Sequence, residues 1–290
     1  MIARSHGTRD LPSSDPPEPK ADRGPPQPPS PPLPPSAAER DPPPPDKQLY
    51  PGHPRSLSGI ALRAFLLGAT LSLSLALLIL ALTSTPPTTP LWRIPFFFAA
   101  LSTFHFLEFW TTARYNTPAA DVDAFLLASN WPAYAIAHAS ATAECLVTGV
   151  FFPDRAWAPA ALGGPALTRA LIGLGLVMVA VGQAVRTVAM VQCGESFNHI
   201  VQSRKKDSHF LVTSGVYAVF RHPSYFGFFW WSVGTQLVLG NAVCSVAYAV
   251  VVWKFFSARI PREERFLVGF FGVEYVEYRN RVKTWIPFIQ

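Results

Sequence analysis

The chain has little charge and few residues suited to holding a metal or a disulfide. Only 14% of its 290 residues are charged and 49% are hydrophobic, so it is too apolar on average for a soluble domain. Cys145, Cys193 and Cys244 show no paired spacing, which argues against a disulfide framework or a cysteine metal site. A glycine-rich phosphate loop, a paired-histidine zinc helix and a serine elbow are also missing. We therefore expect no metal centre.

The first 55 residues differ in composition from the rest. Proline dominates residues 1–55, with scattered charges and no apolar periodicity. Such a segment cannot bury enough surface to offset its ordering entropy, so we expect a disordered proline-rich tail. The first apolar run comes too late in the chain for a signal peptide. Residues 56–290 are expected to form one membrane domain.

Apolar runs follow the tail at regular intervals. A helix needs about 20 mainly apolar residues to cross a bilayer. The candidates are 58–82, 91–112, 122–150, 165–190, 224–240 and 242–257. The third contains Trp131-Pro132 and predicts either one kinked span or a short hairpin. The predicted fold is an all-α, polytopic integral membrane bundle of six to eight transmembrane helices.

The positions of the positive charges that give the net charge of +6 predict the orientation in the membrane rather than nucleic-acid binding. The cations lie at the ends of the apolar runs, for example at 204–206, 259–265 and 279–283. Because Lys and Arg flank the cytoplasmic ends of spans, we expect both chain termini and the ends of the last hairpin to face the cytosol.

Polar residues gather near one of these boundaries in the last third of the chain. The stretch 221–227 reads Arg-His-Pro-Ser-Tyr-Phe-Gly, and Arg259, Glu263 and Glu264 follow one hairpin later. Charged and imidazole groups are costly next to lipid, so a cluster at a membrane boundary is a functional candidate. We expect Pro261 in the first turn of a new helix, with Arg259 and Glu263 on one face. The alternative is an ion pair that only anchors a helix end.

Polar residues also interrupt the apolar runs at 104–140, among them His105, Glu108, Asn116, Asn130 and His138. They are polar enough to line a substrate tunnel. Hydrogen bonds between helices are an equally good explanation, and no role is assigned to them.

Several ordered segments resemble the isoprenylcysteine carboxyl methyltransferases of the eukaryotic endoplasmic reticulum. The resemblance runs from about Leu101 to the C-terminus. It includes the segments 104–109, 197–199, 211–217, 221–236, 263–264, 270–275 and 287–289. The Arg-His-Pro core alone also fits phospholipid methyltransferases and sterol reductases, but the longer ordered set is specific. Two departures are Phe210, where a polar residue is expected, and Lys283, where proline is usual.

The resemblance implies a catalytic part at about 186–290 with its site facing the cytosol. S-adenosyl-L-methionine would donate a methyl group to the C-terminal carboxylate of a farnesylated or geranylgeranylated cysteine in processed CaaX proteins, of the small GTPase or peptide pheromone type. Arg259 would face that carboxylate, and Arg186 is a second candidate for recruiting it. The implied cofactor-binding residues are Gln202, His209, Phe210, Leu211, Val212, Tyr217, His222, Pro223, Ser224, Tyr225 and Glu263.

Other functions remain open at this point. A phospholipid N-methyltransferase would share the methyl donor, but an amine substrate would be repelled by Arg259. A sterol-reductase-like enzyme needs a larger bundle than this chain gives. A membrane scaffold acting through the proline-rich tail would leave the polar cluster without a purpose.

Overall fold

The computed structural model describes residues 46–84, 90–128, 131–152, 164–205, 207 and 209–290. Most of the expected disordered tail lies outside these residues, so its disorder stays a prediction. Residues 46–55, which we assigned to that tail, form a 3₁₀ turn, η1 (Lys47–Leu49), and further turns. Ser56 then caps the first long helix by accepting a hydrogen bond from the Gly59 N–H at 3.1 Å.

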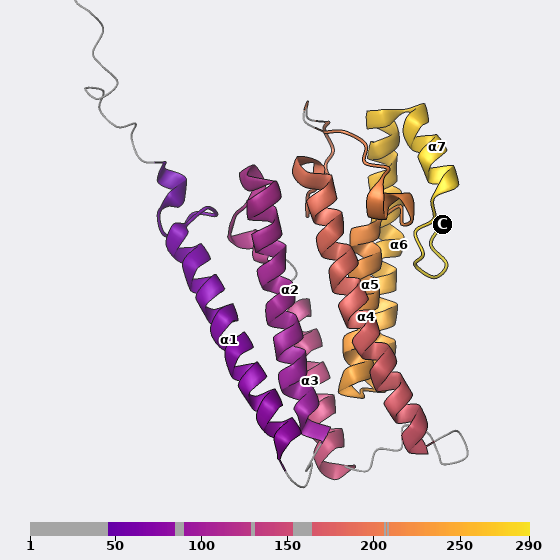
Figure 1. Cartoon of the computed structure of the whole chain (residues 1–290). Coiled ribbons are helices and arrows are strands. Elements are labelled where there is room, and N and C mark those ends of the chain that lie inside the picture. The colour runs from indigo at the N-terminus through magenta and orange to yellow at the C-terminus, as the bar shows by residue number, and fades with distance from the viewer. Residues whose placement is uncertain (1–45, 85–89, 129–130, 153–163, 206, 208) are drawn as a thin grey trace, which may run out of the picture. The chain divides into compact units, whose positions relative to one another are not determined.

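All regular elements among the described residues are helical, as the apolar runs predicted (Figure 1). The longer helices are α1 (Leu57–Thr83), α2 (Arg93–Tyr115), α3 (Ala133–Phe151), α4 (Gly164–Cys193), α5 (Pro223–Leu239), α6 (Val243–Phe271) and α7 (Val273–Arg281). Short 3₁₀ turns between them are η2 (Pro90–Trp92), η3 (Thr117–Ala119), η4 (Val122–Phe125), η6 (Gly194–Ser196) and η7 (Gly215–Ala218).

Three of the described helical segments are long and apolar enough to cross a membrane by length and composition: Leu57–Thr83, Ala166–Ser196 and Val243–Phe271. The helices α1 to α6 each coincide with one predicted apolar run, but α2, α3 and α5 are shorter or more polar than this standard requires. The chain is therefore a helical membrane protein, and a count of six to eight spans stays a prediction.

The third apolar run is neither a kinked span nor a helical hairpin, which corrects the expectation for 122–150. Its first part is the short turn η4, capped by the Asp121 carboxylate, which accepts from the N–H groups of Asp123 and Ala124. Leu126 ends η4 in the left-handed conformation at φ 56°. The helix α3 begins only after Pro132. The polar capping signal therefore overrides the apolar composition, and the first third of the run becomes a loop.

Pro261 also lies differently from the prediction. It does not start a new helix but sits inside α6, which continues through it to Phe271. Proline removes one backbone hydrogen bond from a helix interior, and membrane helices tolerate this where their neighbours compensate. Glu263 and Glu264 consequently lie well inside a long helix rather than in a first turn.

Helices α4 and α5 pack closely because glycines face each other along their contact. A Cβ added at Gly182 would lie 2.6 Å from the Gly227 carbonyl oxygen, and one at Gly234 would lie 2.9 Å from the Gly175 carbonyl oxygen. Both distances are too short for any side chain, so the backbones are in direct contact, as in other small-residue membrane interfaces. Gly227 belongs to the Arg-His-Pro stretch, so this packing fixes the start of α5, where the predicted site lies.

The polar residues at 104–140 make hydrogen bonds between elements. His105 Nδ1 lies 2.7 Å from the Phe125 carbonyl oxygen, and His138 Nδ1 lies 3.0 Å from the Tyr248 hydroxyl. Asn116 donates to the Phe197 carbonyl at 2.8 Å. These contacts fit the interpretation that the residues hold the bundle together. Asn130 lies outside the described residues.

Candidate functional site

The start of α1, the end of α4, the start of α5 and the helix α7 lie at one end of the bundle (Figure 1). The connection between α4 and α5, residues 194–222, is irregular apart from η6 and η7 and runs over this end. It provides polar side chains to this end of the bundle. It also provides backbone N–H and C=O groups, which in a continuous helix would be used in the hydrogen bonds of the helix itself. The first turn of α5 and the later turns of α6 complete the walls.

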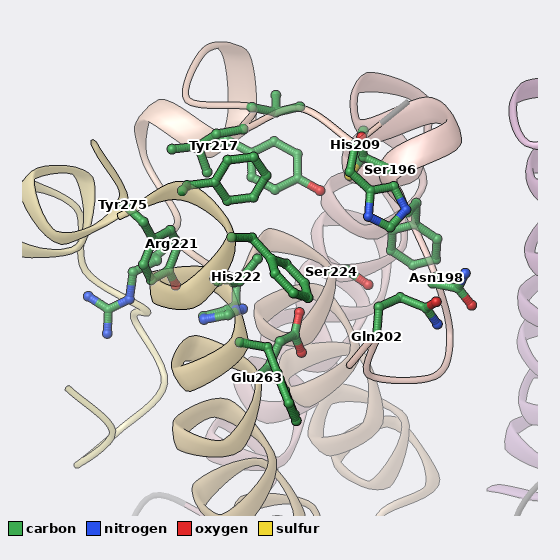
Figure 2. Close-up of a pocket in the computed structure, with 18 of the residues that line it drawn as sticks. Ser196, Asn198, Gln202, His209, Tyr217, Arg221, His222, Ser224, Glu263 and Tyr275 are labelled. Carbon is green, nitrogen blue, oxygen red and sulfur yellow. The ribbon is translucent and has the colours of Figure 1, made fainter. Parts of the chain in front are cut away.

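One cavity at this end, here called the polar cavity, is lined by every residue that the resemblance implied for cofactor binding. Figure 2 shows the Glu263 carboxylate and the His209 ring directed into the space between the α4–α5 connection and the helices. Further lining residues were not assigned from the sequence. They include Ser196, Asn198, Arg221, Phe266, Phe270, Tyr275 and Tyr278.

The sharp turn at Gly215 positions the wall that carries Tyr217. Gly215 has φ 61°, and a Cβ there would lie 2.3 Å from the Gln192 side-chain nitrogen. Gln192 instead accepts a hydrogen bond from the Val216 N–H at 2.9 Å. Burial raises the pKa of Tyr217 well above its usual value, so the phenol stays protonated and donates to the Ala189 carbonyl at 3.2 Å. The sequence alone gave Gly215 no role, because its contact with the Gln192 side chain is visible only in the structure.

A buried ionic network supports the floor of the polar cavity. Arg221 Nε donates to Glu264 Oε1 at 2.6 Å, and His222 Nε2 lies 3.1 Å from the same oxygen. His222 also occupies the N-cap position of α5, with Pro223 at the first helical position. The Arg221 guanidinium points away from the cavity (Figure 2). Arg221 and Glu264 therefore act as supports that hold His222, a role the sequence did not assign.

The second cavity, here called the arginine cavity, contains both arginines proposed from the sequence. It is lined by Arg186, Arg259 and His199 together with Asp121, Asp123 and the aromatic residues Phe197, Tyr225, Phe228, Phe255 and Phe256. A cationic group set among aromatic rings suits a ligand that is anionic at one end and apolar at the other. The loop carrying Asp121 and Asp123 was not predicted to reach the site, because it lies at the start of the third apolar run.

Tyr225 forms part of the wall between the two cavities and lines both. Its hydroxyl donates to the Glu263 carboxylate and accepts from Arg259 Nε at 2.8 Å. Its ring stacks on His222 and on Phe256, at centroid distances of 5.4 Å and 4.8 Å. Arg259 and Glu263 are therefore connected through this phenol, and Arg259 does not share the polar cavity with His222.

The two arginines differ in how much of their hydrogen-bonding capacity is already used. Arg186 forms a bidentate pair with Glu108, and its Nη1 donates to the Ser224 hydroxyl at 2.8 Å and carbonyl at 3.1 Å. Arg259 uses Nε for Tyr225 and Nη2 for the His199 carbonyl at 2.5 Å. Its Nη1 has no hydrogen bond to any described residue. Arg259 therefore has one nitrogen without a hydrogen bond to a described residue, whereas all three guanidinium nitrogens of Arg186 have partners.

His199 links these groups. Its carbonyl holds Arg259, its Nδ1 lies 3.7 Å from Glu108 Oε2, and its Nε2 lies 3.3 Å from the Thr112 hydroxyl. Burial lowers the pKa of His199 below its ordinary value, and the nearby Glu108 only partly offsets this. The ring is therefore neutral near pH 7, which avoids a second positive charge beside Arg259.

The fold is that of a helical membrane protein with two adjacent cavities at one end of the bundle. Comparison with known proteins makes this class specific. Residues 174–269 match the family model described as the isoprenylcysteine carboxyl methyltransferase (ICMT) family.

Several relatives are similar over most of the chain. The protein-S-isoprenylcysteine O-methyltransferase of Saccharomyces cerevisiae is 42% identical over 245 residues, which cover 84% of this chain and 97% of the relative. The Xenopus laevis enzyme of the same name is 41% identical over 236 residues, covering 80% and 74%. A solved structure of the eukaryotic intramembrane Ras methyltransferase ICMT has a TM-score of 0.69 and 38% identity, covering 80% of this chain and 77% of that one. The chain belongs to the ICMT family and is a methyltransferase.

Proposed function

We propose that the protein transfers the methyl group of S-adenosyl-L-methionine to the C-terminal carboxylate of a prenylated cysteine, at a cytosol-facing site in the endoplasmic reticulum membrane. The observation that carries the proposal is the adjacency of the two cavities, with Tyr225 in the wall that they share. The substrates would be processed CaaX proteins of the small GTPase type or prenylated peptide pheromones. They would carry a farnesyl or geranylgeranyl group.

The polar cavity has the donor and acceptor groups that the methyl donor needs. Glu263 offers a carboxylate for a ribose hydroxyl or an ammonium group, and His222 offers a ring nitrogen edge. Tyr275 also lines this cavity, and its buried hydroxyl has no hydrogen-bond partner among the described residues. A buried polar atom without a partner is costly, so a polar ligand here would satisfy it. The residues therefore fit the cofactor, which when bound supplies an electrophilic methyl group on a sulfonium.

The protein residues have to align a nucleophile rather than create one. An α-carboxyl group has a pKa of about 3.5, so the substrate carboxylate is already ionised near pH 7 and no general base is needed. Arg259 can hold that carboxylate through Nη1, because Tyr225 and the His199 carbonyl fix the rest of its guanidinium. Fixed orientation of this kind contributes several orders of magnitude to a rate.

The aromatic wall of the arginine cavity has a second role. Phe228, Phe255 and Phe256 line it beside Arg259. They exclude water from the carboxylate, and a less hydrated carboxylate is a better nucleophile. The same apolar wall suits a prenyl group that enters from the lipid.

The direct test supplies purified protein in lipid nanodiscs with radiolabelled S-adenosyl-L-methionine and one of two acceptors. We expect base-labile label on N-acetyl-S-farnesylcysteine, since methyl esters hydrolyse in base. Label that appears only in phosphatidylethanolamine would overturn the proposal in favour of a phospholipid N-methyltransferase. An acceptor with the farnesyl group but a carboxamide in place of the carboxylate serves as the control and should stay unlabelled.

A further inference from the structure

The last nine residues, 282–290, form an irregular segment that returns from α7 along α5 and α6; we call it the C-terminal strap. Side chains along its course alternate between buried and exposed. Val282, Thr284, Ile286 and Ile289 are buried, whereas Lys283, Trp285 and Phe288 are exposed, as is Arg281 just before the strap. The exposed aromatic residues are large, since Trp285 is 58% and Phe288 94% exposed. The outer face of the strap, together with Arg281 just before it, therefore presents two cations and two aromatic rings.

Three carbonyl groups of the strap accept hydrogen bonds, two of them from side chains on neighbouring helices and one from within the strap. Trp253 Nε1 donates to the Pro287 carbonyl at 2.7 Å, and Trp230 Nε1 donates to the Trp285 carbonyl at 3.4 Å. The Thr284 hydroxyl closes the turn by donating to the Ile289 carbonyl at 2.5 Å. Irregular backbone is excluded from lipid contact unless its polar groups are paired within the protein. These three bonds let the strap lie at the boundary of the bilayer without needing water at those carbonyls.

The composition of the outer face matches one particular environment. Tryptophan and other amphipathic aromatic residues collect at the headgroup level of membranes, and cations beside them attract the anionic lipids of the cytosolic leaflet. Lys283 contributes one of these charges. Its side chain points outward, while its carbonyl keeps a structural role by accepting from the Arg221 N–H at 2.9 Å. Lys283 therefore supports the fold of the strap through its backbone while its side chain stays available at the surface.

The strap is connected to the polar cavity through Arg221. Arg221 Nη1 donates to the carbonyls of Val282 and Arg279 at 2.8 Å and 2.9 Å. Its Nε holds Glu264, which in turn contacts His222 in the cavity wall. A force that keeps the strap in place therefore also keeps His222 in place.

We propose that the outer face of the C-terminal strap binds anionic lipid headgroups of the cytosolic leaflet, and that this contact strengthens cofactor binding through Arg221. The inference rests on the proposed function for its orientation and for the identity of the cofactor site. It adds a lipid-binding surface that lies outside both cavities.

The test compares nanodiscs of phosphatidylcholine alone with nanodiscs that also contain phosphatidylserine. The affinity for S-adenosylhomocysteine is measured by calorimetry in each. One cation near an anionic surface strengthens membrane binding roughly fivefold. We therefore expect S-adenosylhomocysteine to bind up to about fivefold more tightly in the anionic nanodiscs. Raising the salt to about 1 M should remove the difference, because the screening length falls to about 3 Å.

Two double variants separate the strap from general charge effects. Arg281→Gln/Lys283→Gln should lose most of the lipid dependence. Arg262→Gln/Arg265→Gln removes the same charge from exposed positions on α6 and should keep it. Equal loss in both variants, or full lipid dependence in the first, would overturn the proposal.

The location of the strap is measured independently of any ligand. Phe288→Cys is labelled with an environment-sensitive fluorophore, and brominated lipids are added as quenchers. The native cysteines are buried or half-buried, and labelled wild-type protein gives the background. Strong quenching is expected, and its absence would contradict lipid contact. If the label is quenched but the protein does not methylate farnesylcysteine, the lipid contact of the strap is supported and the proposed function is refuted.

Discussion

Arg186 and Arg259 line the same cavity, yet their hydrogen bonds differ. Arg186 is buried, and all three of its guanidinium nitrogens are used by Glu108 and Ser224. Arg259 is held by only two bonds, to Tyr225 and to the His199 carbonyl. A guanidinium whose three nitrogens all have partners joins helices, whereas one with an unpartnered nitrogen can also bind a ligand. The chemistry of an arginine in a membrane site thus depends on how many of its donors the protein has already satisfied.

Removing Arg186 should give the largest change in stability. Arg186→Ala leaves the Glu108 carboxylate buried without its partner, which typically costs about 3–5 kcal/mol of unfolding free energy. Thermal unfolding in detergent should show a large drop in the transition temperature. The double variant Arg186→Met/Glu108→Leu removes both charges and should recover most of the loss. A normal unfolding temperature in Arg186→Ala combined with a failure to use prenylcysteine would instead make Arg186 a substrate ligand.

Removing Arg259 should damage catalysis rather than folding. Arg259→Ala should lower kcat/KM for farnesylcysteine by about 10²–10³-fold, the usual cost of losing one donor to reacting charge. The affinity for S-adenosylhomocysteine should stay close to that of the wild type, because Arg259 does not line the polar cavity. Arg262→Ala, an exposed arginine on the same helix, is the matched control. A weakened cofactor affinity with normal turnover would contradict this assignment.

Changing Glu263 should reverse that pattern and so sharpen the comparison. Hydrogen bonds to charged groups contribute about 1.5–3 kcal/mol, so Glu263→Ala should weaken S-adenosylhomocysteine binding by about ten- to a hundredfold. Turnover at saturating cofactor should fall much less. Isothermal calorimetry and initial rates at several cofactor concentrations give the two quantities. The exposed Glu274 on α7 provides the control variant, Glu274→Ala. An unchanged affinity in Glu263→Ala would remove this residue from the cofactor site.

Tyr225→Phe tests whether the shared wall couples the two cavities. The ring stacking on His222 and Phe256 is retained, but Arg259 Nε and Glu263 both lose a hydrogen bond. Single hydrogen bonds contribute about 1 kcal/mol, so KM should rise about fivefold for each of the two substrates. Tyr248→Phe, which removes a hydroxyl bonded to His138, is the control. An effect confined to one substrate would show that Tyr225 serves one cavity only.

The sequence was informative where its signals are local. Apolar runs located the helices α1 to α6, although α3 occupies only the later part of its run. Every residue that the resemblance implied for cofactor binding lines the polar cavity, but Ser196, Asn198 and Arg221 of the same connection were not assigned. Cofactor binding by these residues stays a prediction. The alignment with the yeast relative covers 245 residues, which extends the similarity beyond the region from Leu101 that the motifs marked.

Other features depend on contacts between distant residues, and the sequence did not reveal them. Arg186 and Glu108 were both noticed, but they are 78 positions apart and nothing in their spacing indicates a pair. Pro261 was expected to start a helix because its missing N–H costs nothing in a first turn, but it lies inside α6. The loop that follows Asp121 was not recognised, because its composition is as apolar as that of a helix. The capping bonds of Asp121, which show that the long helix begins later, are visible only in the structure.

His199 provides the smallest effect and tests why Arg259 has a neutral neighbour. Its pKa is lowered in the folded state by burial, so the folded protein resists protonation. The stability that comes from this neutral ring is complete above the unfolded pKa of about 6.5 and is lost as the pH falls toward the lower folded value. The loss is at most about 1.4 kcal/mol per pH unit for one proton. Thermal unfolding of the wild type between pH 7.5 and pH 5.5 should therefore show a steeper decline than that of His199→Gln, which cannot take up the proton. Parallel declines would mean that groups other than His199 cause the acid sensitivity.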